Sequence, residues 1–161
     1  MKRIVQFFVV YTLLILQSTS LLADRHGFVN TVVIDPGHGG NHPGTVGRKS
    51  KEKDIVLAIS LKLGAYIEKN LPDVKVIYTR TTDVNPPLHR RAQIANENNA
   101  DLFISIHLNG ATNTSAIGTE TFVMGTHVSQ ANLEVARREN QAILYEEDYQ
   151  EMYGGFDPNS P

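Results

Sequence analysis

The sequence has no cysteine and no tryptophan among its 161 residues. Without cysteine the chain has no disulfide, no thiolate nucleophile and no thiolate ligand, so a metal site must be built from nitrogen and oxygen donors. An excess of basic charge is also missing, because 15 Lys and Arg residues face 17 Asp and Glu residues, for a net charge of -2. Nucleic-acid binding requires a strongly basic surface, and we therefore expect no nucleic-acid partner.

The chain also lacks an apolar run long enough to cross a membrane. Its main apolar stretch lies between Ile4 and Leu16, whereas a spanning helix needs roughly 20 such residues. A Lys-Arg pair precedes this stretch, and small or polar residues follow it up to Ala23, which is typical of a secretory signal peptide. We predict that residues 1–23 are a signal peptide. The mature protein is then periplasmic or secreted, in the cell envelope, with no stable membrane span.

Beyond the signal peptide, β-branched apolar runs alternate with amphipathic stretches. The runs end abruptly in turn residues and indicate buried strands, while the stretches have the three-and-four apolar spacing of helices. In chain order the pattern predicts strands over 31–35, 74–79, 102–107 and 118–124, and helices over 53–71, 88–98 and 129–145. Such alternation predicts an α/β fold, a single domain whose mostly parallel or mixed sheet has helices on both faces.

The domain is expected to cover residues 24–145. Residues 146–161 are rich in acids, glycine and proline, and this composition is typical of a polar, flexible tail, here one belonging to an inserted segment. For the helix over 53–71, Ser50 is a candidate N-cap. The apolar side chains expected on its inward face are Val56, Ile59, Leu63 and Ile67.

Three chemistry-bearing residues are predicted to meet at one edge of this sheet. His38 follows the first strand, Glu52 begins the next helix on its inward stripe, and His107 ends the third strand. Ligands of open parallel sheets gather at the carboxyl ends of the strands. Two imidazoles and one carboxylate form a ligand set that catalytic zinc uses, with water in the fourth position. The pattern therefore predicts a zinc site suited to hydrolysis.

Each of these residues also has a simpler interpretation. The glycine-rich loop at 36–40 can be a tight turn with an incidental histidine. Glu52 can be a first-turn acid favoured by the helix dipole. His42, in the same loop as His38, is either a contact of the site or an ordinary loop histidine. The convergence of His38, Glu52 and His107 on one edge favours the metal site over these separate explanations.

Several motifs together resemble the zinc-dependent N-acetylmuramoyl-L-alanine amidases of the cell-division type, the amidase_3 family. They are VIDPGHGG at 33–40, KEKD at 51–54, YTRTTD at 78–83 and ADLFISIH at 100–107, with Arg90 and Ala95-Asn96. The resemblance implies that Zn²⁺ is held by His38, Glu52 and His107. It also implies hydrolysis of the amide between N-acetylmuramic acid and L-alanine in peptidoglycan, with a glutamate as general base. For Arg80 and Arg90 we expect structural ion pairs with Asp83 or Asp101.

The family places its catalytic glutamate in a late strand, and no matching stretch occurs before Pro161. We therefore expect a chain that is incomplete at the C-terminus, whose catalytic base lies beyond this point. In some such amidases an inserted helical segment covers the zinc cleft with an acidic side chain until an activator protein moves it. Residues 129–151 stand where that insertion begins. The alternatives are a non-catalytic zinc-containing module that binds or regulates the wall, and a zinc carboxypeptidase acting on stem peptides.

Overall fold

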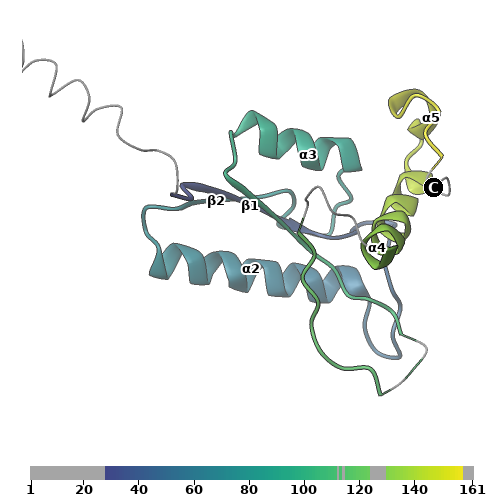
Figure 1. The fold of residues 1–161 in the computed structure, drawn as a ribbon, viewed down its shortest axis with the longest axis horizontal. Coiled ribbons are helices and arrows are strands. Elements are labelled where there is room, and N and C mark those ends of the chain that lie inside the picture. Colours follow the sequence, from purple (N-terminus) through teal and green to yellow (C-terminus); the bar gives the residue numbers. More distant parts are fainter. Residues whose placement is uncertain (1–27, 112, 114, 124–129, 158–161) are drawn as a thin grey trace, which may run out of the picture.

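The computed structural model describes residues 28–111, 113, 115–123 and 130–157, so the predicted signal peptide lies outside the described residues. Within these residues, three strands alternate with two helices, and three further helical elements follow (Figure 1). They are β1 (Thr31–Pro36), α2 (Glu52–Asn70), β2 (Lys75–Tyr78), α3 (Leu88–Glu97), β3 (Leu102–Ile106), α4 (Gln130–Asn140), the 3-10 helix η1 (Gln141–Tyr145) and α5 (Tyr149–Met152).

The strands form a parallel sheet in the order β2-β1-β3. Figure 1 shows α2 against one face of the sheet and α3 against the other, so the predicted α/β architecture is confirmed. The central strand β1 carries the core, because Val32, Val33 and Ile34 are buried and β1 contacts both helices and both neighbouring strands. Since all three strands run the same way, the loops after β1 and β3 leave the sheet at one edge.

Helix α2 forms where the sequence predicts it, but its buried face is rotated from the predicted one. The buried positions include Glu52, Val56, Ser60 and Gly64, whereas Ile59 is 42% exposed. Gly64 explains the rotation, because a Cβ atom there would lie 1.6 Å from the hydroxyl of Tyr78 on β2. The backbone of α2 thus packs directly on the sheet through small residues. The predicted cap was also wrong, since Lys51 occupies the N-cap and makes no side-chain capping bond.

The strand predicted over 118–124 is absent from the described residues 118–123. Ile117 and Val123 are 97% and 78% exposed. The stretch therefore buries no apolar face that could offset the conformational entropy lost when a strand forms. The helix predicted over 129–145 is present as α4 followed by η1. The stretch expected to be a flexible tail contains α5. In the described part of the chain, no helix is long and apolar enough to cross a membrane.

Candidate metal centre

The loop that leaves β1 has an unusual backbone that points His38 across the end of the sheet. His38 has a φ of 59°, and Gly39 and Gly40 follow with φ of 131° and 52°. This left-handed region is costly for a residue with a Cβ atom and free for glycine. A side chain at Gly39 would also collide with the carbonyl oxygen of Val84. The glycines at 39 and 40 are therefore required by the path that brings His38 to the sheet edge.

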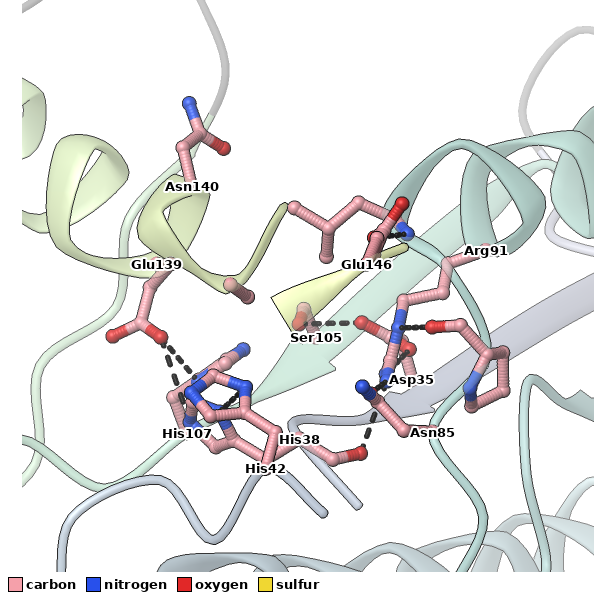
Figure 2. Close-up of a pocket in the computed structure, with 13 residues that line it drawn as sticks. Asp35, His38, His42, Asn85, Arg91, Ser105, His107, Glu139, Asn140 and Glu146 are labelled. Atoms are coloured by element: carbon pink, nitrogen blue, oxygen red, sulfur yellow. Dashed lines mark hydrogen bonds and ion pairs between the residues drawn. The ribbon is translucent and has the colours of Figure 1, made fainter. Parts of the chain in front are cut away.

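The structure brings the three predicted ligand residues together, and Figure 2 shows two of them, His38 and His107. Nε2 of His38 lies 3.1 Å from Nδ1 of His107 and 3.0 Å from Oε1 of Glu52. The same Glu52 oxygen lies 3.2 Å from Nδ1 of His107. One nitrogen of each histidine and one oxygen of Glu52 thus face a common point, as the sheet-edge argument predicts.

Backbone groups fix the carboxylate of Glu52 in place. Its Oε1 accepts a hydrogen bond from the N–H of Leu108 (2.7 Å), and its Oε2 accepts one from the N–H of Thr45 (2.8 Å). Burial would raise the pKa of Glu52, but hydrogen bonds from His107, His38 and these two N–H groups outweigh it and hold the pKa well below its ordinary value. Glu52 is therefore an oriented, ionised carboxylate 3% exposed to solvent.

The spacing of the donor atoms fits a zinc ion. A tetrahedral zinc with bonds of about 2.0–2.1 Å separates its ligand atoms by about 3.3 Å, close to the three distances above. Glycines keep this space open: a Cβ atom at Gly37 would lie 2.5 Å from the His107 ring, and one at Gly44 would lie 2.6 Å from Oε2 of Glu52. The residues present therefore fit a divalent metal held by imidazole and carboxylate ligands.

The structure adds a fourth donor, Glu139 of α4, which the sequence did not single out. Oε2 of Glu139 lies 2.8 Å from Nδ1 of His107 and 3.6 Å from Nε2 of His38. Together with the two histidines, it forms a cluster whose ligand atoms lie within 4.8 Å of one another. No motif surrounds Glu139, so its place could be inferred only from the way α4 folds back over the sheet edge.

Two carboxylates surround the His107 imidazole. Burial lowers the pKa of His107, but the hydrogen bonds and charges of Glu139 and Glu52 dominate and raise it to about 9. In the absence of a metal, His107 is then protonated at neutral pH. Metal binding must displace that proton, because only the neutral imidazole is a ligand.

His42 contacts the His38 ring nitrogen that does not face His107 and Glu52. Its Nδ1 lies 3.2 Å from Nδ1 of His38, and burial, followed by the charge of His38, lowers the pKa of His42 to about 4. When His38 binds a metal through Nε2, its Nδ1 carries the hydrogen, and a neutral His42 can accept it. The His42 ring also stacks on Tyr145, with centroids 4.2 Å apart. Of the two interpretations of His42, contact with the site is the one observed.

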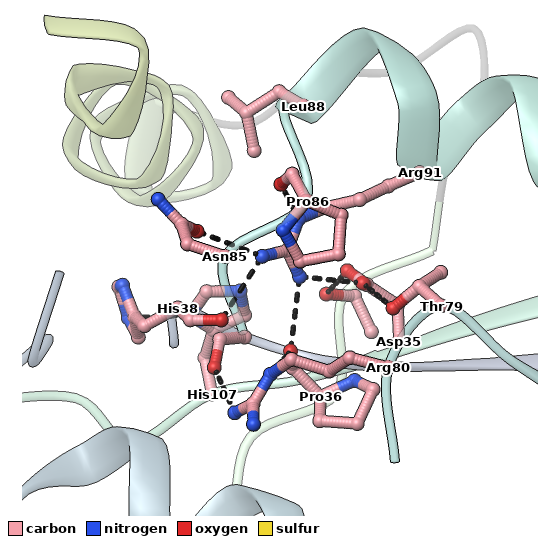
Figure 3. Close-up of polar contacts among 12 residues, drawn as sticks. Asp35, Pro36, His38, Thr79, Arg80, Asn85, Pro86, Leu88, Arg91 and His107 are labelled. Carbon is pink, nitrogen blue, oxygen red and sulfur yellow. Dashed lines mark hydrogen bonds and ion pairs between the residues drawn. The ribbon is translucent and has the colours of Figure 1, made fainter. Parts of the chain in front are cut away.

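The basic residues near the sheet edge differ in their roles. Arg80 donates to the carbonyl oxygens of Pro36 and Gly37. Arg90 forms an exposed ion pair with Glu97 on its own helix. Its neighbour Arg91, which the sequence did not single out, is instead buried beside Asp35 (Figure 3).

The first turn of α3 binds the segment that follows Glu139, through Glu146 and Tyr153. The N–H of Leu88 donates to Oε1 of Glu146 (2.8 Å), and the N–H of His89 donates to the hydroxyl of Tyr153 (3.0 Å), which in turn donates to Oε2 of Glu146 (2.8 Å). These contacts satisfy two first-turn N–H groups that α3 leaves free, because its N-cap is Pro87 without a side-chain cap. A cavity of about 180 Å³ remains between the histidines, Arg91 and this segment.

Comparison with known proteins agrees with the family resemblance of the sequence motifs. A family model described as Amidase_3, N-acetylmuramoyl-L-alanine amidase, matches residues 32–153. The chain is 38% identical over 123 residues to N-acetylmuramoyl-L-alanine amidase AmiA of Escherichia coli strain K12, covering 74% of this chain and 42% of that protein. It is 39% identical over 116 residues to AmiC of Escherichia coli O6:H1, covering 70% and 28% of the two chains.

Solved structures are similar over a shorter part of the chain. The catalytic domain of the amidase CwlV from Bacillus (Paenibacillus) polymyxa var. colistinus has a TM-score of 0.51 at 37% identity, covering 54% of this chain and 49% of that one. An N-acetylmuramoyl-L-alanine amidase from Clostridium difficile 630 has a TM-score of 0.50 at 43% identity, covering 55% and 48%. The chain spans less than half the length of these curated relatives and structures.

Proposed function

The chain belongs to the Amidase_3 family of N-acetylmuramoyl-L-alanine amidases, and from this membership we propose that it hydrolyses peptidoglycan. The bond cleaved is the amide between N-acetylmuramic acid and the L-alanine of the stem peptide. The observation that carries the proposal is the convergence of His38, Glu52 and His107, whose donor atoms lie 3.0 to 3.2 Å apart. The protein acts in the cell envelope, where its substrate is found and where its predicted signal peptide directs it.

In this proposal His38, Glu52 and His107 hold one zinc ion. When bound there, zinc supplies Lewis acidity, lowering the pKa of a bound water to about 7 and polarising the scissile carbonyl. The protein's own part is to orient the ligands. The N–H groups of Leu108 and Thr45 aim the Glu52 carboxylate, and His42 accepts the hydrogen of His38 Nδ1. The general base is not assigned to any residue of this chain.

We further propose that residues 130–153, here called the C-terminal helical segment, hold the site closed. Catalytic zinc sites keep a fourth position for water or substrate. Oε2 of Glu139, 2.8 Å from Nδ1 of His107, lies where it can take that position. Opening then requires the segment to move, which is a role for an activator protein. The acidic side chain is supplied by α4, and the contacts of Glu146 and Tyr153 with α3 hold the segment in place.

The test of the activity is product analysis after the full-length protein digests purified peptidoglycan in the presence of zinc. An amidase frees intact stem peptides with a new N-terminal L-alanine and leaves muramic acid unsubstituted. A zinc carboxypeptidase instead shortens the peptides at their C-terminal end and leaves them attached. A wall-binding module retains zinc and sediments with the wall without any product.

A Glu139→Gln variant is digested in parallel, so that a closed site is not mistaken for an inactive one. Release of intact stem peptides by either protein supports the amidase. Trimmed but attached peptides, or wall binding without product from both proteins, contradict it.

A further inference from the structure

The guanidinium of Arg91 uses all of its N–H groups on backbone and side chains around the His38 loop (Figure 3). Its Nη1 donates to Oδ1 of Asp35 (2.8 Å) and to the carbonyl of Pro36 (2.9 Å). Its Nη2 donates to the carbonyl of His38 (3.0 Å) and to Oδ1 of Asn85 (3.2 Å), and its Nε donates to the carbonyl of Pro86 (2.9 Å). A guanidinium has five N–H donors, and each one is accounted for.

This arrangement joins the end of β1, the His38 peptide and the turn before α3. Arg91 is 4% exposed and Asp35 is 5% exposed, so the group is held in a buried position with a paired charge. Asp35 is itself fixed by hydrogen bonds from Thr79 on the side of β2 and from Ser105 on β3. The guanidinium therefore connects the rigid centre of the sheet to a loop outside it.

The loop needs such support because His38 has a φ of 59°. A non-glycine residue in the left-handed region stays there only when surrounding contacts hold it. We propose that Arg91 is a positioning residue of the metal centre: its hydrogen bond to the His38 carbonyl fixes the peptide that aims the His38 imidazole at His107 and Glu52. This inference rests on the proposed metal site and adds to it a residue that touches neither metal nor substrate.

The planar fork is essential to this role. A lysine would keep the charge opposite Asp35, but its single flexible ammonium has three donors and cannot hold Pro36, His38 and Pro86 in one plane. Arg90, the neighbour singled out by the sequence, points outward to Glu97. Of these two adjacent arginines, only Arg91 contacts the His38 loop.

The test compares Zn²⁺ affinity, measured by competition with a chromophoric chelator, in the wild type, Arg91→Lys and Thr79→Val. The Thr79→Val variant is the matched control, because it removes another buried hydrogen bond to Asp35 and leaves the His38 carbonyl untouched. We expect Arg91→Lys to bind Zn²⁺ roughly 10- to 100-fold more weakly, the usual effect of losing an outer-shell partner. Thr79→Val is expected to lose stability while keeping its affinity within about threefold, well below that effect.

The absorption bands of bound Co²⁺ report ligand geometry and are recorded for the same proteins. Altered bands in Arg91→Lys, with unaltered bands in Thr79→Val, support positioning, because a general loss of stability does not change ligand geometry. Equal Zn²⁺ affinity in wild type and Arg91→Lys overturns the inference while leaving the metal site intact. Absence of Zn²⁺ binding in the wild type instead removes the proposed metal site and this inference with it.

If Arg91→Lys does not fold, Asn85→Ala decides the question. Asn85 is half-buried and accepts from Nη2 of Arg91, the nitrogen that also holds the His38 carbonyl. A Zn²⁺ affinity reduced beyond that of Thr79→Val supports the role of Arg91, and an unchanged affinity overturns it.

Discussion

Oε2 of Glu139 lies 2.8 Å from Nδ1 of His107, so a residue of α4 reaches into the cluster formed by the loops after β1 and β3. The contact is made by a charged pair that is largely shielded from water, with the histidine side chain 24% and the glutamate side chain 22% exposed. In the proposed function, this contact is the one by which the C-terminal helical segment controls access to the metal.

Replacing Glu139 by Gln should open the site. The amide is a far weaker metal ligand than the carboxylate, so the fourth position becomes available to water and substrate. In the full-length protein, we expect Glu139→Gln to retain zinc and to digest peptidoglycan at least about tenfold faster than the wild type, the equivalent of one charged hydrogen bond. Glu134→Gln, on an exposed position of the same helix, is the control and should behave as the wild type. Equal rates for all three proteins would contradict a closed site.

The metal-free protein should show a pH dependence centred on His107. Its pKa is raised to about 9, above the ordinary value of about 6.5, so its stabilising contribution is complete below pH 6.5 and is lost as the pH rises through 9. NMR titration of the His107 ring should give a pKa near 9 in the wild type and a clearly lower one in Glu139→Gln. A wild-type value near 6.5 would mean that the two carboxylates do not flank the ring.

The contacts of Glu146 and Tyr153 with α3 should be necessary to keep the C-terminal helical segment over the metal site. Glu146→Ala removes the acceptor of the Leu88 N–H and of the Tyr153 hydroxyl. We expect the exchange of the His89 N–H to become about tenfold faster, although His89 does not contact Glu146 directly, because its partner Tyr153 leaves with the segment. Glu147→Ala, at an exposed position, serves as control. Unchanged exchange at His89 in Glu146→Ala would show that the two contacts are independent.

Gly64 tests the close packing of α2, the helix that begins with Glu52, against Tyr78 of β2. Alanine is ordinarily better than glycine in a helix by up to about 1 kcal/mol. At this position its Cβ would lie 1.6 Å from the hydroxyl of Tyr78, so we expect Gly64→Ala to lower the free energy of unfolding by about 1–3 kcal/mol. Urea denaturation measures this, with the exposed Ala65→Gly as the reference for helix propensity alone. A stabilised Gly64→Ala would contradict the close packing of α2 on β2.

Much of the sheet and the outline of the site could be predicted from local patterns. The β-branched run ending in Pro36-Gly37 and the run ending in His107 both form strands, and a parallel sheet necessarily brings their carboxyl ends to one edge. The inward position of Glu52 was also predictable, because it lies one helical turn before the buried Val56. The three ligand candidates could therefore be placed together without any coordinates.

The features that escaped prediction depend on contacts between distant parts of the chain. Apolar spacing alone favoured Ile59 as a buried residue, yet close packing of Gly64 on Tyr78 turns it outward. Glu139 and Arg91 are charged residues among many, and only the folded chain shows that one reaches His107 and the other holds the His38 loop. The stretch 118–123 shows the opposite error, in which a plausible local pattern finds no surface to pack against.

The proposed metal centre is measured directly by the zinc content of the purified protein after exposure to Zn²⁺ and removal of the free ion. We predict about one zinc per chain in the wild type, almost none in His107→Ala or Glu52→Ala, and a full complement in His89→Ala, whose ring contacts Tyr153 rather than the cluster. A wild-type protein nearly free of zinc, or a His107→Ala variant that retains it, would contradict the metal centre.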